Sequence, residues 1–136
     1  MAKKTRRTTT AVERVWIPVP DEPFLDPMDE PWTFTRGRNG PEELDLPGVL
    51  LMTVRYMPMP RGTTLDSEMA LDALMVLKAA QEQRGGGIEL RKDVYDWMLS
   101  AFKENAHHLW PKPDAAFLCK WLKDNVSASG PNGAKP

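Results

Sequence analysis

Apolar residues recur at helical spacing in the last third of the chain. A first stripe is spaced by three and four residues, as one face of an α-helix requires, and consists of Leu90, Val94, Trp97, Met98 and Ala101. Pro111 and Pro113 interrupt this pattern, because proline lacks a backbone N–H and has a fixed φ. A second stripe follows and consists of Phe117, Leu118, Trp121, Leu122 and Val126. The pattern predicts two packed helices and points to no chemistry.

A further helix is predicted to begin near Leu65. Thr63 precedes Asp66 by three residues, which is the spacing of a capping box. Residues 69–77 contain eight apolar residues of nine, so most of the helix surface should be covered. The glycines at 85–87 end the helix, since glycine readily adopts a left-handed cap conformation.

The best strand candidate is residues 49–57, VLLMTVRYM, which is rich in strand-forming residues and bounded by prolines. Residues 88–90 predict a second short strand. Strand, helix and strand would form a right-handed crossover with the two strands parallel. Because two strands make a poor sheet, we expect a further pairing segment, either residues 32–35, the chain near residues 12–19, or another chain.

Residues 12–48 hold seven of the thirteen prolines together with many large apolar side chains. Such chain is extended, and it either wraps its own domain or orders on a partner. We favour an arm that leaves the domain, because the domain is small and already rich in apolar groups. The expected organisation is a basic, then acidic arm at residues 1–47, a compact α+β domain at residues 48–126 and a flexible tail at residues 127–136. The domain should hold one or two short strands and three helices.

Length and composition indicate a single-domain protein without a membrane span. A chain of 136 residues and 15.4 kDa predicts one domain. Neither a membrane span nor a secretory signal is evident in the sequence, and a single cysteine fits a reducing cytoplasm. The net charge of −1 is unevenly distributed, since residues 1–14 carry five Lys/Arg and one Glu whereas residues 15–48 carry eight Asp/Glu and two Arg.

Candidate chemistry is sparse. The adjacent His107 and His108 point about 100° apart on a helix, so together with Cys119 they would still lack a fourth metal ligand. Cys119 lies between apolar stripe positions, which favours an inert, half-buried thiol. The carboxylate pairs fall in the proline-rich segment, which offers no rigid pocket for acid–base work. We therefore expect no enzyme activity, no cofactor and no metal.

Two functional hypotheses remain. The first is a non-enzymatic interaction or assembly protein that binds another protein, or itself as an oligomer, through the apolar side chains of the arm and of one loop, namely Trp16, Ile17, Phe24, Leu25, Trp32, Phe34, Met57 and Met59. The alternative is a nucleic-acid-associated protein that contacts phosphates through Lys3, Lys4, Arg6, Arg7 and Arg14. The balanced total charge favours the first.

The order of elements resembles one family of proteins. A strand at 49–57, a helix at 65–83, the Ile88 and Leu90 step, Tyr95, Trp110 and a final helix at 117–126 together look like small accessory proteins encoded in tailed-phage genomes. The resemblance covers roughly residues 49–126 and includes no catalytic motif. It implies a phage origin, a role in virion assembly or in binding a host protein, and a location in the host cytoplasm or the virion.

Overall fold

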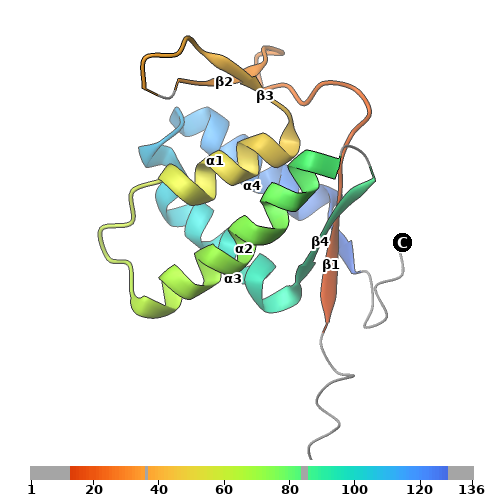
Figure 1. The fold of residues 1–136 in the computed structure, drawn as a ribbon. Coiled ribbons are helices and arrows are strands. Elements are labelled where there is room, and N and C mark those ends of the chain that lie inside the picture. Colours follow the sequence, from red (N-terminus) through yellow and green to blue (C-terminus); the bar gives the residue numbers. More distant parts are fainter. Residues whose placement is uncertain (1–12, 36, 84–85, 129–136) are drawn as a thin grey trace, which may run out of the picture.

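The computed structural model describes residues 13–35, 37–83 and 86–128. These residues form an α+β fold with four α-helices and five short strands in two small antiparallel sheets (Figure 1), which confirms the predicted class. In chain order the elements are β1 (Arg14–Pro18), β2 (Trp32–Phe34), β3 (Glu42–Leu44), α1 (Leu46–Tyr56), α2 (Thr64–Gln83), β4 (Gly87–Arg91), α3 (Lys92–Asn105), the 3₁₀ turn η2 (Ala106–His108), α4 (Lys112–Asn125) and β5 (Ser127–Ala128).

The larger sheet is built around the first strand of the chain. Its order is β4-β1-β5, and β1 runs antiparallel to both neighbours. Val15 pairs with Leu90 and Ile17 with Ile88, and all four side chains are buried. Of the possible partners for residues 88–90, the chain near residues 12–19 is therefore the one used. The predicted parallel crossover is wrong, because the strand that precedes α2 in that prediction is a helix.

Residues 49–57 were predicted as a strand, and this prediction is wrong because residues 49–56 belong to α1 and Met57 is its C-cap. The Asp45 side chain caps the helix by accepting a 2.9 Å hydrogen bond from the Gly48 N–H. Pro47 lies in the first turn, where its missing N–H costs nothing. Every residue from 46 to 54 is buried. A run that is apolar throughout does not distinguish a buried strand from a buried helix, which explains the error.

The described part of the expected arm packs against the protein's own helices. Ile17, Phe24 and Trp32 are 0%, 7% and 2% exposed. The Phe24 and Trp32 rings stack with centroids 5.9 Å apart, and Trp32 meets Trp110 edge-on at 5.0 Å. The β2–β3 hairpin holds Trp32 in place by pairing it with Leu44, and it lies above α1 at the top of Figure 1. The proline-rich segment thus supplies core that the helices lack.

The remaining helices follow the predicted stripes. α2 extends over nearly the predicted residues. The first C-terminal stripe forms α3 with Met98 fully buried, except that Leu90 lies in β4. The Tyr95 hydroxyl donates a 2.9 Å hydrogen bond to the Leu122 carbonyl, which ties α3 to α4. Two residues of the expected tail form β5, and residues 129–136 lie outside the described residues.

Candidate functional site

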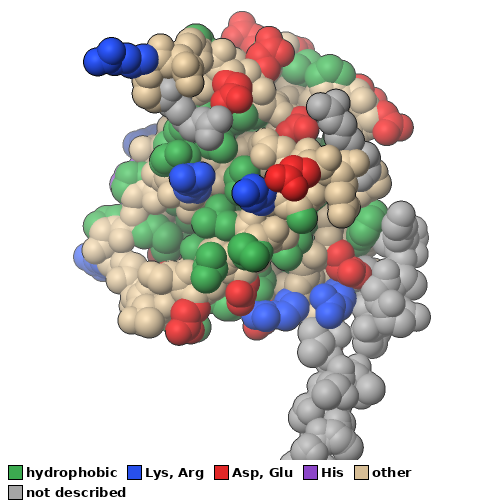
Figure 2. Space-filling view, viewed as in Figure 1, with side chains coloured by type: hydrophobic (Ala, Val, Ile, Leu, Met, Phe, Trp, Pro, Cys, Tyr) green, Lys and Arg blue, Asp and Glu red, His purple; other side chains and the backbone are tan. Residues whose placement is uncertain are grey.

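The outer face of α2 exposes large apolar side chains. Leu65, Leu71 and Met75 are 61%, 59% and 67% exposed, and only Ala73 and Leu77 of this helix are buried. Leu71, Met75 and Ala79 are spaced by four residues, so they form one ridge along the helix. Hydrophobic side chains gather over α2 on the face seen in Figure 2. We define the α2 outer face as Leu65, Leu71, Met75 and Ala79.

An apolar groove of about 520 Å³ continues this face toward the sheet. Met75, Val76 and Ala79 of α2 form one wall, and residues 86–89 at the start of β4 form the other. The half-buried indole of Trp16 also lines the groove. The Trp16 indole lies directly against Gly87, where a Cβ atom would clash with the ring, so glycine at this position lets the indole form part of the groove wall.

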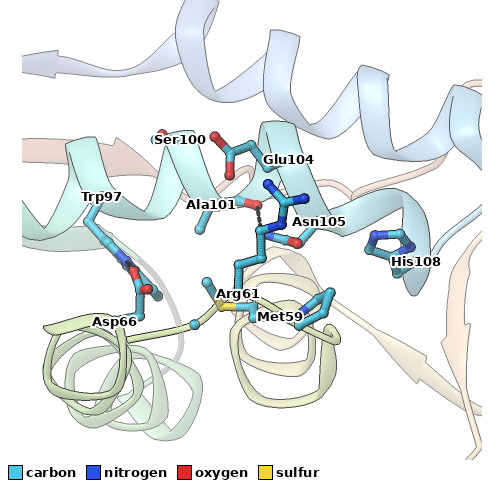
Figure 3. A pocket seen from close by; sticks show the side chains of 11 residues that line it. Met59, Arg61, Asp66, Trp97, Ser100, Ala101, Glu104, Asn105 and His108 are labelled. Atoms are coloured by element: carbon cyan, nitrogen blue, oxygen red, sulfur yellow. Dashed lines mark hydrogen bonds between the residues drawn. The ribbon is translucent and has the colours of Figure 1, made fainter. Parts of the chain in front are cut away.

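A second hollow, of about 300 Å³, lies between α3 and the loop before α2 (Figure 3). The Trp97 indole N–H donates a 2.8 Å hydrogen bond to Asp66 Oδ1, while Oδ2 accepts from the backbone N–H and the hydroxyl of Thr63. The Trp97 bond is the main cause that lowers the pKa of Asp66. Both oxygens thus accept hydrogen bonds that hold the start of α2 against α3.

Arg61 extends across this hollow toward α3, where Glu104 lies (Figure 3). The walls carry one exposed cation, one exposed carboxylate and His108 at the rim. Nothing in this arrangement pairs a nucleophile with a base at hydrogen-bond distance among the described residues.

The histidines and the cysteine form no common site. His107 and His108 are both exposed, with ring centroids 4.1 Å apart. Across residues 13–35, 37–83 and 86–128, no group of three or more His, Cys, Asp or Glu is placed to hold a metal ion. Burial raises the pKa of the Cys119 thiol, and Lys103 offsets this only in part. The thiol lies in the core cluster, as the stripe pattern indicated.

The predicted partner-binding residues divide into two groups. Ile17, Phe24, Trp32 and Met57 are buried, so the structure corrects the expectation that they are free to dock. Their burial is energetically favoured because each joins the hydrophobic core cluster formed by the described residues. The remaining four are partly exposed, namely Trp16, Leu25, Phe34 and Met59. Of these, only Trp16 adjoins the α2 outer face.

The predicted nucleic-acid-binding residues are mostly outside the described residues, since Lys3, Lys4, Arg6 and Arg7 precede residue 13. Arg14 begins β1 and is half-buried. It shares a shallow hollow with Lys92 and Lys123. The Lys92 ammonium is bonded to Asp96 at 2.7 Å, so part of this positive charge is neutralised.

Sequence reasoning missed Leu65, Leu71 and Met75. For Leu71 and Met75 the signal was the number of apolar residues in residues 69–77, which exceeds what one buried stripe of a helix needs. The sequence predicted that other parts of the chain would cover most of this helix. Within the described residues, no segment covers the outer face of α2, and its apolar side chains are exposed.

Comparisons with protein families, with curated proteins and with solved structures found no match to this chain. The likeness to tailed-phage accessory proteins therefore stays a prediction. No helix among the described residues has both the length and the apolar character needed to cross a membrane.

Proposed function

We propose that this protein is a non-enzymatic interaction or assembly protein that docks on a partner protein through the α2 outer face. The observation that carries the proposal is the ridge of Leu71, Met75 and Ala79 on the solvent side of a helix in a small domain. Three of the five exposed large apolar side chains described lie on α2. Exposed apolar groups that gather on one face are typical of interaction sites.

Apolar burial at this face would contribute part of the binding energy of a partner. Completing the burial of Leu71 and Met75 would contribute about 1–2 kcal/mol each, given their present exposure. The adjoining groove provides a concave surface in which a partner side chain can be enclosed. The proposal therefore agrees with the sequence-based hypothesis of a binding protein. It differs in placing the partner contact on α2 and not on the proline-rich segment.

Site-specific photo-crosslinking tests the proposal. A photoreactive phenylalanine analogue is placed at position 75, and at position 28 as the matched control, in cells that naturally produce the protein. Met28 is equally apolar and 76% exposed but lies in the loop before β2. We expect a discrete crosslinked protein from position 75 that Leu71→Asp abolishes, and none from position 28. Equal crosslinking from both positions, or none from position 75, would contradict the proposal.

The alternative proposal is association with nucleic acid through the basic N-terminal residues. Its support is a hollow lined by three basic residues, Arg14, Lys92 and Lys123. In the sequence, Arg14 follows shortly after the basic residues Lys3, Lys4, Arg6 and Arg7. This proposal predicts binding to DNA or RNA that weakens steeply as salt rises, because counterions are released on binding. A titration of fluorescent DNA and RNA at increasing salt measures this slope, and a flat response removes the alternative.

A further inference from the structure

We infer that the element that docks on the α2 outer face is a basic amphipathic helix of a partner protein. This inference rests on the proposed function and adds the chemistry of the partner. Three features of the described residues support it: the shape of the ridge, the charges beside it and the charge of the neighbouring surface.

The shape favours a helix. Leu71, Met75 and Ala79 form a ridge of side chains four residues apart, which spans about 12 Å along the axis. Helices pack by placing such ridges into the grooves of a facing helix. The small side chain of Ala79 and the groove beside it leave room for a partner ridge to insert. An extended segment would need main-chain contacts at a sheet edge, and β4 is an edge strand beside the groove. The large exposed apolar side chains, however, belong to α2, and side-chain contacts of this kind favour a helix.

The charges that flank the ridge favour a basic partner. Glu68, Asp72 and Glu82 lie on the solvent side of α2, and Lys78 is the basic residue among them. Arg91 forms ion pairs with both Asp72 at 3.3 Å and Asp93 at 3.0 Å. The charges of Arg91 and Asp93 cancel, so the net charge beside the ridge stays negative. Lysine or arginine beside the apolar residues of a partner helix would therefore meet opposite charge.

The surface next to the C-terminal end of α2 strengthens this preference. Gln81 of α2 lines a groove whose other walls carry four carboxylates, those of Asp21, Glu22, Glu43 and Asp45. Residues 21–45 hold eight Asp/Glu and two Arg. Gln81 lies about 120° around α2 from Met75, so this acidic groove adjoins the C-terminal end of the helix and not its ridge. Its negative field attracts a basic segment toward that end of α2 and repels anionic nucleic acid.

A second copy of this chain meets mixed charge at the α2 outer face. In an antiparallel pair of α2 helices centred on Met75, Glu68 of one copy would face Glu82 of the other, whereas Asp72 would face Lys78, so two repulsive and two attractive contacts would form. The charges therefore give such a pair no net attraction. A partner with the opposite charge removes the repulsion and gains attraction at the same two positions.

Two synthetic peptides test the inference on the full-length protein. One is a helix with leucine on one face and lysine on the other, and the matched peptide carries glutamate in place of lysine. Binding is followed by amide chemical shifts of the isotope-labelled protein, with sedimentation velocity to report self-association. The variants are Leu71→Asp, the charge reversal of Glu68→Lys with Glu82→Lys, and Met28→Asp as the control.

We expect the leucine–lysine peptide to shift amides of residues 71–79 and to bind about tenfold more tightly than the leucine–glutamate peptide. Charge reversal should invert this preference, Leu71→Asp should weaken both peptides, and Met28→Asp should change neither. Equal affinity for the two peptides, or shifts confined to residues 21–45, would overturn the basic helix while leaving the position-75 crosslink intact. Self-association abolished by Leu71→Asp would assign the face to a second copy. Absence of both peptide binding and the crosslink would overturn the inference and the proposed function together.

Discussion

The indole N–H of Trp110 donates a 2.7 Å hydrogen bond to the hydroxyl of Thr53 in the interior of the protein. Thr53 is 0% exposed and donates its own hydroxyl proton to the Val49 carbonyl at 2.6 Å. The bond joins α1 to the chain that follows η2, across 57 positions of sequence. It satisfies both polar groups where water does not reach them, so it holds these two parts of the fold in one arrangement.

Replacing Thr53 by valine removes the acceptor and keeps the volume. We expect the free energy of unfolding to fall by about 1–3 kcal/mol, because the Trp110 N–H is left buried without a partner. Urea denaturation followed by tryptophan fluorescence measures the change. Thr33→Val on the exposed side of β2 is the control and should leave the midpoint unchanged. Equal stability of the two variants would show that the buried bond contributes nothing.

Gly87→Ala should destabilise the sheet between β1 and β4. A Cβ atom at this position would lie 2.6 Å from Trp16 Cε2 and 2.8 Å from the Ile17 carbonyl oxygen. The backbone atom cannot move aside cheaply, so we expect a loss of about 1–3 kcal/mol, as for other overpacked sites. Thermal unfolding checks the prediction. Gly40→Ala serves as the control, since a Cβ there meets no atom within 4 Å.

Phe24→Ala distinguishes a packed segment from a free arm. Phe24 is 7% exposed, stacks on Trp32 and meets Trp121 edge-on at 5.3 Å. We expect a loss of about 3–5 kcal/mol, which is typical of phenylalanine removed from a core. Chemical denaturation measures it, and Met28→Ala, four residues later and 76% exposed, is the control. A Phe24→Ala protein as stable as the control would restore the arm that leaves the domain.

The Asp66 carboxyl should titrate below its ordinary pKa of 3.8, chiefly because it accepts the hydrogen bond from Trp97. A lowered folded pKa means that the contribution of this group to stability is present above pH 3.8 and is lost as pH falls through the folded pKa. Carbon-detected NMR titration gives the pKa directly. Trp97→Phe should raise it more than Thr63→Val does, because Thr63→Val keeps the backbone donor. The reverse order would show that the Thr63 contacts dominate.

The helices at residues 64–83, 92–105 and 112–125 could be predicted because their signals are local. Thr63 and Asp66 form the expected capping box, with the Asp66 N–H donating to Thr63 Oγ1 at 3.2 Å. The stripes that contain Met98 and Leu118 face inward at the spacing of the sequence. Pro111 and Pro113 also mark the boundary between the last two helices. Each of these features depends on residues within one or two helical turns.

The binding surface could not be predicted, because exposure is a property of the whole fold. Met75 and Leu77 are both apolar and two residues apart, yet one is 67% exposed and the other is fully buried. The apolar pattern of residues 69–77 did not distinguish the exposed residue from the buried one. Which of them is covered depends on where the β1–β4 sheet and α3 pack, and this is fixed by contacts between distant parts of the chain.

The sequence by itself determined where three helices lie and which of their residues share a face, since spacing along a helix is a local property. Only the tertiary structure decided that residues 49–54 are helical, that Phe24 and Trp32 complete the core, and that Met75 stays at the surface. The physical reason is that apolar segments compete for a limited interior. The arrangement of all of them together, and not the apolar character of any one, decides which side chains remain free to bind a partner.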